Sequence, residues 1–221
     1  MENTILRIMF FSLPLIVGII AFGGMCVGMA ITNIFSRDLP PEKKPGKVKL
    51  NLCCAGILLK EFVNIDLQDF GQEIIHDLTK GIPYPDNSVD YIIIYHGMEH
   101  FIEPHHLMKE MYRVLKPNGK VEIRVPHYSN NTAYEFTHQF IFSWSAFNNR
   151  FLNQDSSLSR QCGRWKLTWS RIMLAQKNTK YPVLYFIEWM VNIGNKTRGL
   201  YDKIFCKFIP AYEIWVIIEK V

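Results

Sequence analysis

Apolar residues follow two patterns in this chain, one long uncharged stretch near the N-terminus and a series of short runs after it. Residues 8–36 contain no charged side chain. A helix needs about 20 apolar residues to cross a hydrocarbon core of roughly 30 Å, so this stretch is long enough to span a bilayer. The alternative is a cleaved signal peptide, whose apolar core usually covers only about 7–15 residues before a small-residue cleavage site. The longer run here, which ends at Arg37, favours an uncleaved anchor.

Basic residues flank this predicted span unequally. Arg7 precedes it, and five basic residues follow it closely, namely Arg37, Lys43, Lys44, Lys47 and Lys49. The positive-inside rule therefore predicts a single-pass membrane protein whose C-terminal domain faces the cytoplasm. Gly24 and Gly28 form a GxxxG pair that would allow a homodimer through close helix contact, although such pairs also arise by chance.

Prolines separate the span from the rest of the chain. Residues 37–47 hold three of them with several charges, so a helix cannot continue there and we predict a linker. The predicted organisation is an anchor over residues 1–36, a linker over 37–47 and one domain over 48–221. The cysteines of that domain match no zinc spacing, and we expect them to be reduced and no metal to be bound.

Short apolar runs bounded by acids or turn residues recur after residue 47. They predict strands at residues 48–52, 62–65, 73–76, 89–95, 120–125 and 211–220. The run at 91–95 is continuously apolar, as expected for a central strand that is covered on both faces. Strands that alternate with helical segments predict an α/β fold with a mostly parallel sheet.

Helical signals are fewer. Residues 104–115 predict a helix with one apolar stripe, which begins at Pro104 and stops at a turn over 116–119. The region 150–212 is aromatic and apolar with interleaved basic residues. It is interpreted as a core helix with further strands, or alternatively as a segment, 181–194, that lies against a bilayer.

Composition narrows the class of protein. The chain has 221 residues, 48% hydrophobic and 20% charged, which excludes an intrinsically disordered protein. Five cysteines are too few for a secreted disulfide scaffold. The net charge of +5 lies entirely after the predicted span, because residues 1–36 hold one acid and one base. The attraction of a mildly basic domain to an anionic leaflet explains this positive charge, so we expect no nucleic acid as a partner.

Acidic side chains follow two of the predicted strands. Ligands of parallel sheets bind beyond the carboxyl ends of the strands, and Asp66 and Asp77 stand at two such ends. An acid in this place accepts hydrogen bonds from the hydroxyls of a ribose. Each could instead cap a helix or form a turn, as Asp often does. Their joint placement favours a ligand of the nucleoside type.

The chain contains the strings KLNLCCA at 49–55, VNID at 63–66, HDLTK at 76–80, IPYPDNS at 82–88, RVLKPNG at 113–119 and VPHY at 125–128. Together these strings resemble class I S-adenosylmethionine-dependent methyltransferases of the methyltransferase-11 type. The resemblance covers residues 48–151 well and the remainder loosely. It implies a Rossmann-like, mostly parallel sheet, here preceded by one transmembrane helix, and S-adenosylmethionine as the cofactor.

The resemblance also implies roles for individual residues. Asp66 would bind the ribose hydroxyls, Asp77 with Leu78 would lie beside the adenine ring, and the loop after the first strand would pass under the methionine part. The implied cofactor-binding residues are Cys53, Cys54, Ala55, Gly56, Asp66, Leu67, Asp77, Leu78 and His96.

Methyl transfer requires an aligned acceptor, and a base if the acceptor carries a proton. The candidates for this base are His96, His100, His127 and His138, each of which could instead be a hydrogen-bonded structural residue. Tyr128 is a further candidate, to cover the cofactor or to shape the acceptor pocket.

The chain departs from the family pattern in the first loop. Cys53 and Ala55 replace the two glycines of the usual Gly-x-Gly, and only twelve residues separate Cys53 from Asp66, too few for a full helix. Two hypotheses follow. The first is a membrane-anchored methyltransferase that acts on a small-molecule or lipid-linked, membrane-associated acceptor. The second is a degenerate methyltransferase fold that serves as a binding or assembly module.

Overall fold

The computed structural model of the protein describes residues 46–150, 157–174 and 180–221. The predicted anchor, its glycine pair and most of the predicted linker lie outside the described residues. Within the described ranges, no helix combines the length and the apolar character needed to cross a bilayer.

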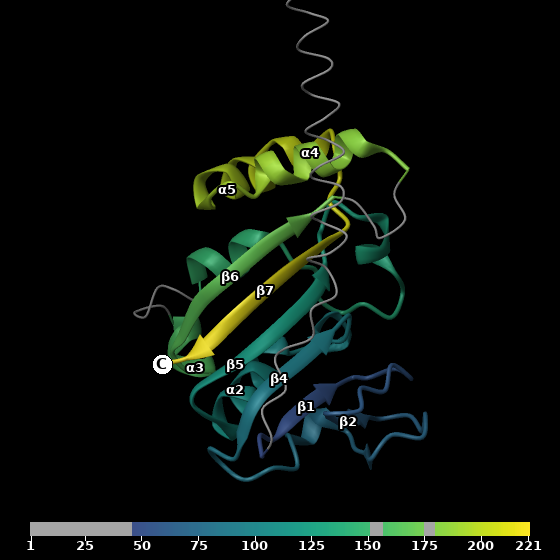
Figure 1. Ribbon diagram of the computed structural model, residues 1–221, viewed down its shortest axis with the longest axis vertical. Coiled ribbons are helices and arrows are strands. Elements are labelled where there is room, and N and C mark those ends of the chain that lie inside the picture. The colour runs from purple at the N-terminus through teal and green to yellow at the C-terminus, as the bar shows by residue number, and fades with distance from the viewer. Residues whose placement is uncertain (1–45, 151–156, 175–179) are drawn as a thin grey trace, which may run out of the picture.

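A seven-stranded sheet forms the centre of the described structure (Figure 1). The strand order is β3-β2-β1-β4-β5-β7-β6. The strands from β3 to β5 run parallel, whereas β7 is antiparallel to both β5 and β6. The strand bounds are Lys49–Leu52 for β1, Val63–Asp66 for β2, Ile74–Ile75 for β3, Val89–Tyr95 for β4, Leu115–Pro126 for β5, Trp165–Met173 for β6 and Glu213–Lys220 for β7. The predicted α/β fold with a mostly parallel sheet is confirmed.

The apolar runs become the core of the sheet. Ile92 and Ile94 of β4 are completely buried, and Ile93, which points to the opposite face, is buried as well. Each buried side chain of this size contributes roughly 1.5–3 kcal/mol through removal of apolar surface from water. The prediction of a central strand covered on both faces is confirmed.

Some predicted element boundaries are wrong. The third strand shrinks to two residues, and the last begins at Glu213 rather than at residue 211. The predicted turn over 116–119 is part of β5, since Leu115 already pairs with Val89. The register shifts before Lys120 pairs with Tyr91, so the turn residues form a bulge, with Asn118 at a positive φ of 64°. Turn residues in a strand are accommodated by such a bulge.

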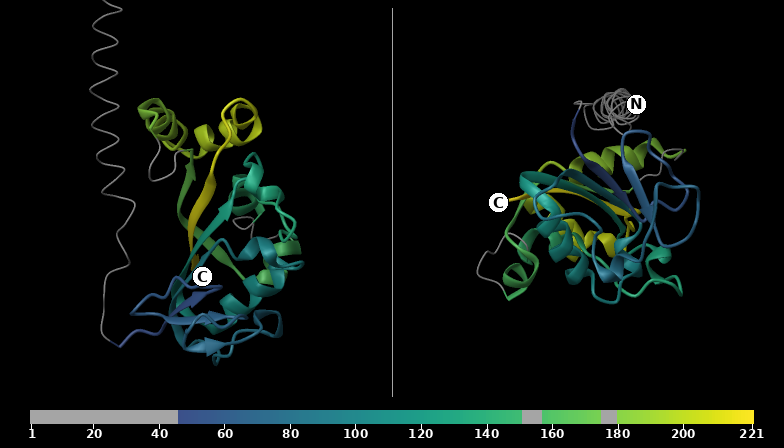
Figure 2. Two further views of the ribbon diagram at one scale, coloured as in Figure 1. Left: turned by 90° about the vertical axis from the view of Figure 1, so that its right-hand side faces the viewer. Right: turned by 90° about the horizontal axis from the view of Figure 1, so that it is seen from below.

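Four α-helices accompany the strands in the described part of the chain. They are α2 at Pro104–Val114, α3 at Ser157–Cys162, α4 at Pro182–Val191 and α5 at Asn195–Lys203. The apolar stripe of α2 is buried, and Figure 2 shows α2 and α3 on one face of the sheet. Helices α4 and α5 lie beyond the carboxyl end of β5 (Figure 1).

On the opposite face of the sheet, α4 contacts β6 through the ion pair of Glu188 and Arg171. The connections from β1 to β2 and from β2 to β3 contain no helix, and for the first of them this was expected from its length. Aromatic and charged side chains cover the strands there. The Arg124 guanidinium lies 4.3 Å from the ring centre of Tyr95 and 3.8 Å from that of Trp215, within reach of cation–π attraction.

Candidate functional site

A cavity of about 460 Å³ opens at the carboxyl ends of β1, β2 and β4. Seven of the predicted cofactor-binding residues line it, namely Cys53, Ala55, Asp66, Leu67, Asp77, Leu78 and His96. Cys54 is buried beneath the loop, and Gly56 lies outside the lining. The topology thus brings together residues that end or follow the four strands β1, β2, β3 and β4, as expected for ligand sites of parallel sheets.

The loop after β1 has the left-handed backbone conformation that glycine usually adopts, although two of its three left-handed residues are not glycine. Cys53, Ala55 and Gly56 have φ angles of 54°, 43° and 79°. This left-handed conformation costs a residue with a β-carbon roughly 1–2 kcal/mol. The amide N–H of Ala55 donates to Asp66 Oδ2 over 3.0 Å and so ties the loop to the end of β2. The replacement of glycine therefore introduces strain but leaves the path of the chain intact.

Cys53 packs closely against the end of β4. A β-carbon placed on Gly97 would lie 2.6 Å from Cys53 Cβ, so the two segments meet at a distance that only glycine permits. Burial, followed by the charges of Asp66 and Glu99, raises the pKa of the Cys53 thiol to about 12. The thiol is therefore protonated at neutral pH, and we assign it no nucleophilic role.

The two predicted acids hold their loops in shape. Asp66 accepts hydrogen bonds from the backbone amides of Ala55 and Gln68, the second over 3.1 Å. Asp77 accepts from the amide of Thr79 over 3.0 Å and from its hydroxyl, and it caps the short helix η1, Leu78–Lys80. These hydrogen bonds from Thr79 lower the pKa of Asp77. Asp77 thus caps a helix, which was the alternative to ligand binding in the sequence analysis. The same residue also lines the cavity.

His96 directly follows β4 at the cavity and lies between two carboxylates. Its Nε2 is 2.8 Å from Glu213 Oε2, and its Nδ1 is 3.5 Å from Glu99 Oε1. Burial alone would lower the pKa of His96, but the hydrogen bond to Glu213 and the negative charges of Glu213 and Glu99 outweigh it and raise that pKa to about 9. The imidazole is therefore protonated at neutral pH and cannot accept a further proton there.

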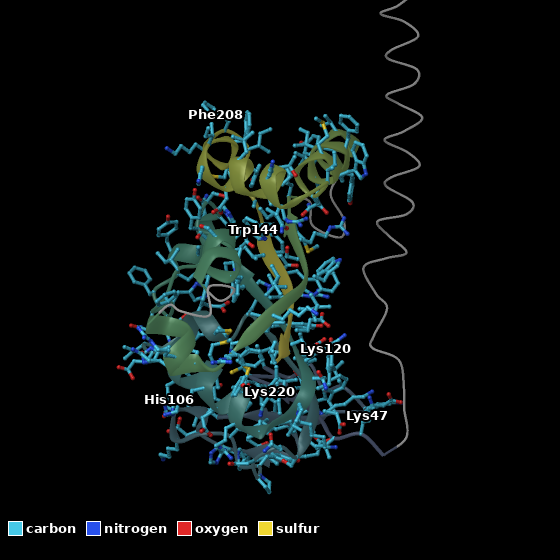
Figure 3. All side chains as sticks on the ribbon, turned by 90° about the vertical axis from the view of Figure 1, so that its left-hand side faces the viewer. Lys47, His106, Lys120, Trp144, Phe208 and Lys220 are labelled. Atoms are coloured by element: carbon cyan, nitrogen blue, oxygen red, sulfur yellow. The ribbon has the colours of Figure 1, made fainter. Side chains whose placement is uncertain are left out.

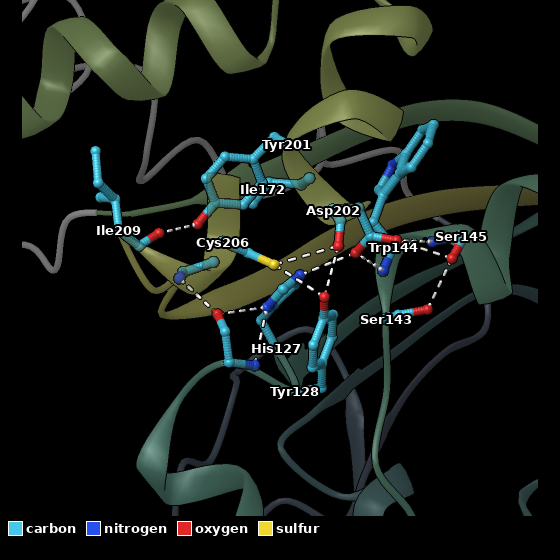
Figure 4. A network of polar contacts seen from close by, with 12 residues as sticks. His127, Tyr128, Ser143, Trp144, Ser145, Ile172, Tyr201, Asp202, Cys206 and Ile209 are labelled. Carbon is cyan, nitrogen blue, oxygen red and sulfur yellow. Dashed lines mark hydrogen bonds and ion pairs between the residues drawn. The ribbon is translucent and has the colours of Figure 1, made fainter. Parts of the chain in front are cut away.

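His127 and Tyr128 belong to a buried network away from the cavity lining (Figure 4). His127 is fully buried, and its Nε2 lies 3.0 Å from Asp202 Oδ1 of α5. Its Nδ1 lies 2.8 Å from the Ser129 hydroxyl. The Tyr128 hydroxyl donates to the backbone carbonyl of Asp202. The structure thus places these two candidates where they join β5 to α5.

His138 is brought to a group that sequence reasoning did not find. Glu99, His100 and His138 each offer one donor atom, and these atoms lie within 4.8 Å of one another. His100 and the neighbouring Thr137 line the cavity, so the group stands at its rim. Residues 100 and 138 are 38 positions apart, and no local pattern links them.

Part of the chain is similar in sequence to known methyltransferases. A family model described as "Methyltransferase domain" matches residues 58–123. The demethylmenaquinone methyltransferase of Listeria monocytogenes serotype 4a (strain HCC23) is 43% identical over 98 residues, which cover 44% of this chain and 40% of that protein. The protein of the same name from Geobacillus sp. (strain WCH70) is 45% identical over 49 residues, 22% of this chain and 21% of that one. The chain therefore spans less than half the length of these two curated relatives.

Solved structures share the fold at low sequence identity. A chain in the complex between the Haloferax volcanii Trm112 methyltransferase activator and a methyltransferase has a TM-score of 0.51 at 14% identity, covering 90% of this chain and 94% of that one. The [4+2]-cyclase SpnF has a TM-score of 0.50 at 14% identity, covering 79% of this chain and 75% of that one. At such identity the likeness concerns the fold alone, since one fold hosts many activities.

Proposed function

Because the chain has the fold of the class I S-adenosylmethionine-dependent methyltransferases, we propose that it binds S-adenosylmethionine and transfers its methyl group to an acceptor at the membrane. The observation that carries the proposal is the cavity itself, around which a left-handed loop and two strand-end acids converge. S-adenosylmethionine is the methyl donor of the matched family.

The residues around the cavity suit the parts of this cofactor. Asp66 keeps lone pairs for the ribose hydroxyls beyond the two amides that it accepts. Leu67 and Leu78 contribute apolar side chains to the cavity lining, against which an adenine ring would pack. The cofactor supplies an activated methyl group when bound. The imidazolium of His96 would stay near the acceptor as a positive charge rather than as a base.

A catalytically degenerate module is the second candidate. The observation in its favour is the strained loop, in which the β-carbons of Cys53 and Ala55 replace glycine. Both glycines can be restored by Cys53→Gly and Ala55→Gly. The release of up to roughly 1–2 kcal/mol of left-handed strain at each site is partly offset by the flexibility of glycine.

Calorimetry with S-adenosylmethionine distinguishes the two candidates. The natural chain is expected to release or absorb heat on binding, and the double variant to bind at least as tightly. No binding by either protein at millimolar cofactor would contradict the proposed function. Binding that arises only after both glycines are restored would instead support the degenerate module.

An acceptor at the membrane is supported by the surface of α4, α5 and the short helix η5, Phe205–Lys207. Large apolar side chains are exposed there, and we call this surface the apolar cap: Val183, Trp189, Met190, Ile193, Leu200, Ile204, Phe205 and Phe208. Figure 3 shows Phe208 at the outer end of the described residues. An apolar cavity of about 290 Å³ opens within this region. Exposed apolar patches of this kind mark interaction sites.

The charges around the apolar cap complement anionic lipid headgroups. Lys196, Lys203 and Lys207 are exposed beside it. The two acids of α4 and α5 are buried, because Glu188 pairs with Arg171 over 2.6 Å and Asp202 pairs with His127. The exposed charge of these helices is therefore positive, which attracts an anionic leaflet.

Vesicle flotation tests this membrane surface on a chain that begins at Gly46. The fragment is expected to float with vesicles that contain phosphatidylglycerol. The double variant Trp189→Ser and Phe208→Ser is expected to partition at least about tenfold less, because it loses two apolar anchors. Phe136→Ser, which alters a fully exposed ring outside the cap, is the matched control. A fragment that stays in solution, or an equal loss in the control, would contradict the membrane surface.

A further inference from the structure

Glu99 is a buried carboxylate that the site described so far does not use. Its side chain is 1% exposed, and neither of its oxygens accepts a hydrogen bond from the described residues. The nearest charge is His96 Nδ1, 3.5 Å away from Oε1, beyond good hydrogen-bond distance. A buried charge needs a partner or a metal, because removal of a carboxylate from water is very unfavourable.

Two imidazoles stand beside this carboxylate. His100 and His138 lie with their ring centres 4.8 Å apart, and one donor atom of each is within 4.8 Å of a Glu99 oxygen. Ligand atoms that share a tetrahedral metal at about 2.1 Å are about 3.4 Å apart. Side-chain movements of about 1 Å would therefore close the group around one ion.

Each imidazole has one ring nitrogen near a carbonyl or carboxylate oxygen, and the other ring nitrogen is left for a metal. His100 Nδ1 lies 3.2 Å from the backbone carbonyl of Thr137, which leaves Nε2 for another partner. His138 Nε2 lies 4.0 Å from Glu135, and its buried Nδ1 has no hydrogen-bond partner in the described residues. A metal-binding histidine typically directs its other ring nitrogen at a carbonyl or a carboxylate.

The backbone holds the three residues together before any ion binds. Glu99 and His100 belong to the short helix η2, Met98–His100, which follows β4. The amides of Gln139 and Phe140 both donate to the carbonyl of Glu99, over 2.7 and 3.1 Å. His138 is thus fixed beside Glu99 by the chain itself.

We infer that Glu99, His100 and His138 bind a divalent transition metal, with zinc as the reference ion, at the rim of the cavity. Two imidazoles and one carboxylate are a ligand set for zinc or iron rather than for magnesium, and they leave coordination positions open. His100 and Thr137 line the cavity, so an open position is close to it.

The role of the ion at this place rests on the proposed function. An acceptor hydroxyl bound to the metal would have a lowered pKa and lose its proton to solvent. Its oxygen would form the bond to the methyl carbon, while the methyl–sulfur bond breaks and leaves its electron pair on sulfur. Such an acceptor would need no neutral histidine as a base.

Zinc titration of the full-length protein, kept in a non-ionic detergent and carrying no polyhistidine tag, tests the site. Calorimetry is expected to find one ion per chain, and zinc is expected to raise the thermal unfolding midpoint. Glu99→Gln and His100→Ala are each expected to weaken binding by about 100-fold or more, because changes to outer partners alone cost about 10–100-fold. His105→Ala, which removes an exposed imidazole of α2, is the matched control and is expected to bind as the natural chain does.

Equal zinc binding by the natural chain and both site variants would overturn the inference, as would the absence of saturation at millimolar zinc. Because His100 is exposed, its replacement leaves the core intact even if Glu99→Gln fails to fold. If Glu99 served only as the counter-ion of His96, its loss would lower stability equally with and without zinc. Zinc binding is measured without S-adenosylmethionine, so its failure is separate from failure of the proposed function.

Discussion

Replacement of Asp66 by asparagine is expected to weaken S-adenosylmethionine binding by about 30- to 1000-fold. The carboxylate would accept hydrogen bonds from two ribose hydroxyls, and a hydrogen bond to a charged group contributes roughly 1.5–3 kcal/mol. The amide keeps only one acceptor oxygen, so we expect a loss of about 2–4 kcal/mol, where 1.4 kcal/mol is a factor of ten. Titration calorimetry of both proteins measures the effect.

Asp69→Asn is the control for this experiment. Asp69 is exposed in the same connection between β2 and β3, and its carboxylate accepts a hydrogen bond from the amide of Gly71. It does not line the cavity. Equal affinities of the natural chain and the Asp66 variant would contradict the assignment of Asp66 to the ribose, and equal weakening in both variants would make the effect one of net charge.

Replacement of Asp202 by asparagine is expected to destabilise the fold by about 3 kcal/mol. Its two oxygens accept from His127, from the amides of Trp144 and Ser145 and from the Ser145 hydroxyl, at 2.8–3.3 Å. Loss of this buried charge leaves the donors incompletely paired. At roughly 2–4 °C per kcal/mol for a domain of this size, the unfolding midpoint falls by about 6–12 °C.

The pH dependence of this effect has a definite sign. Burial would raise the pKa of Asp202, but the hydrogen bonds from His127 and Ser145 outweigh it and lower that pKa. Its stabilisation is therefore present at neutral pH and disappears as the pH falls below the ordinary carboxyl range, so the two proteins converge in acid. Asp86→Asn, at an exposed ion pair with Arg113, should shift the midpoint little. An unfolding midpoint of the Asp202 variant equal to that of the natural chain would contradict the structural role of the network.

Local patterns predicted most of the sheet. The runs that became β1, β2, β4 and β5 are apolar because their side chains enter the core, and period and composition reveal such runs without a partner strand. The acids at the ends of β2 and β3 were found in the same way. Their convergence on one cavity followed from a general property of parallel sheets.

Contacts between segments that are distant in the chain could not be predicted from the sequence. The pairing of His127 with Asp202 joins residues 75 positions apart, and it turned a candidate base into a structural residue. The direction of β7 and the group of Glu99, His100 and His138 likewise depend on which elements meet in space. Apolar residues spaced every two or 3.6 positions indicate that one face of a strand or helix is buried. The spacing does not indicate which element packs against that face.

The sequence alone determined that this chain forms an α/β sheet with acids at successive strand ends, because strand burial and turn chemistry are local properties. It also determined that glycine is missing from the first loop. Only the tertiary structure decided that this loop keeps its left-handed path, since a hydrogen bond from Ala55 to Asp66 closes it across two strands. Only the tertiary structure placed Glu99 in a buried group with two histidines, because the backbone contacts that assemble it join segments far apart in the chain.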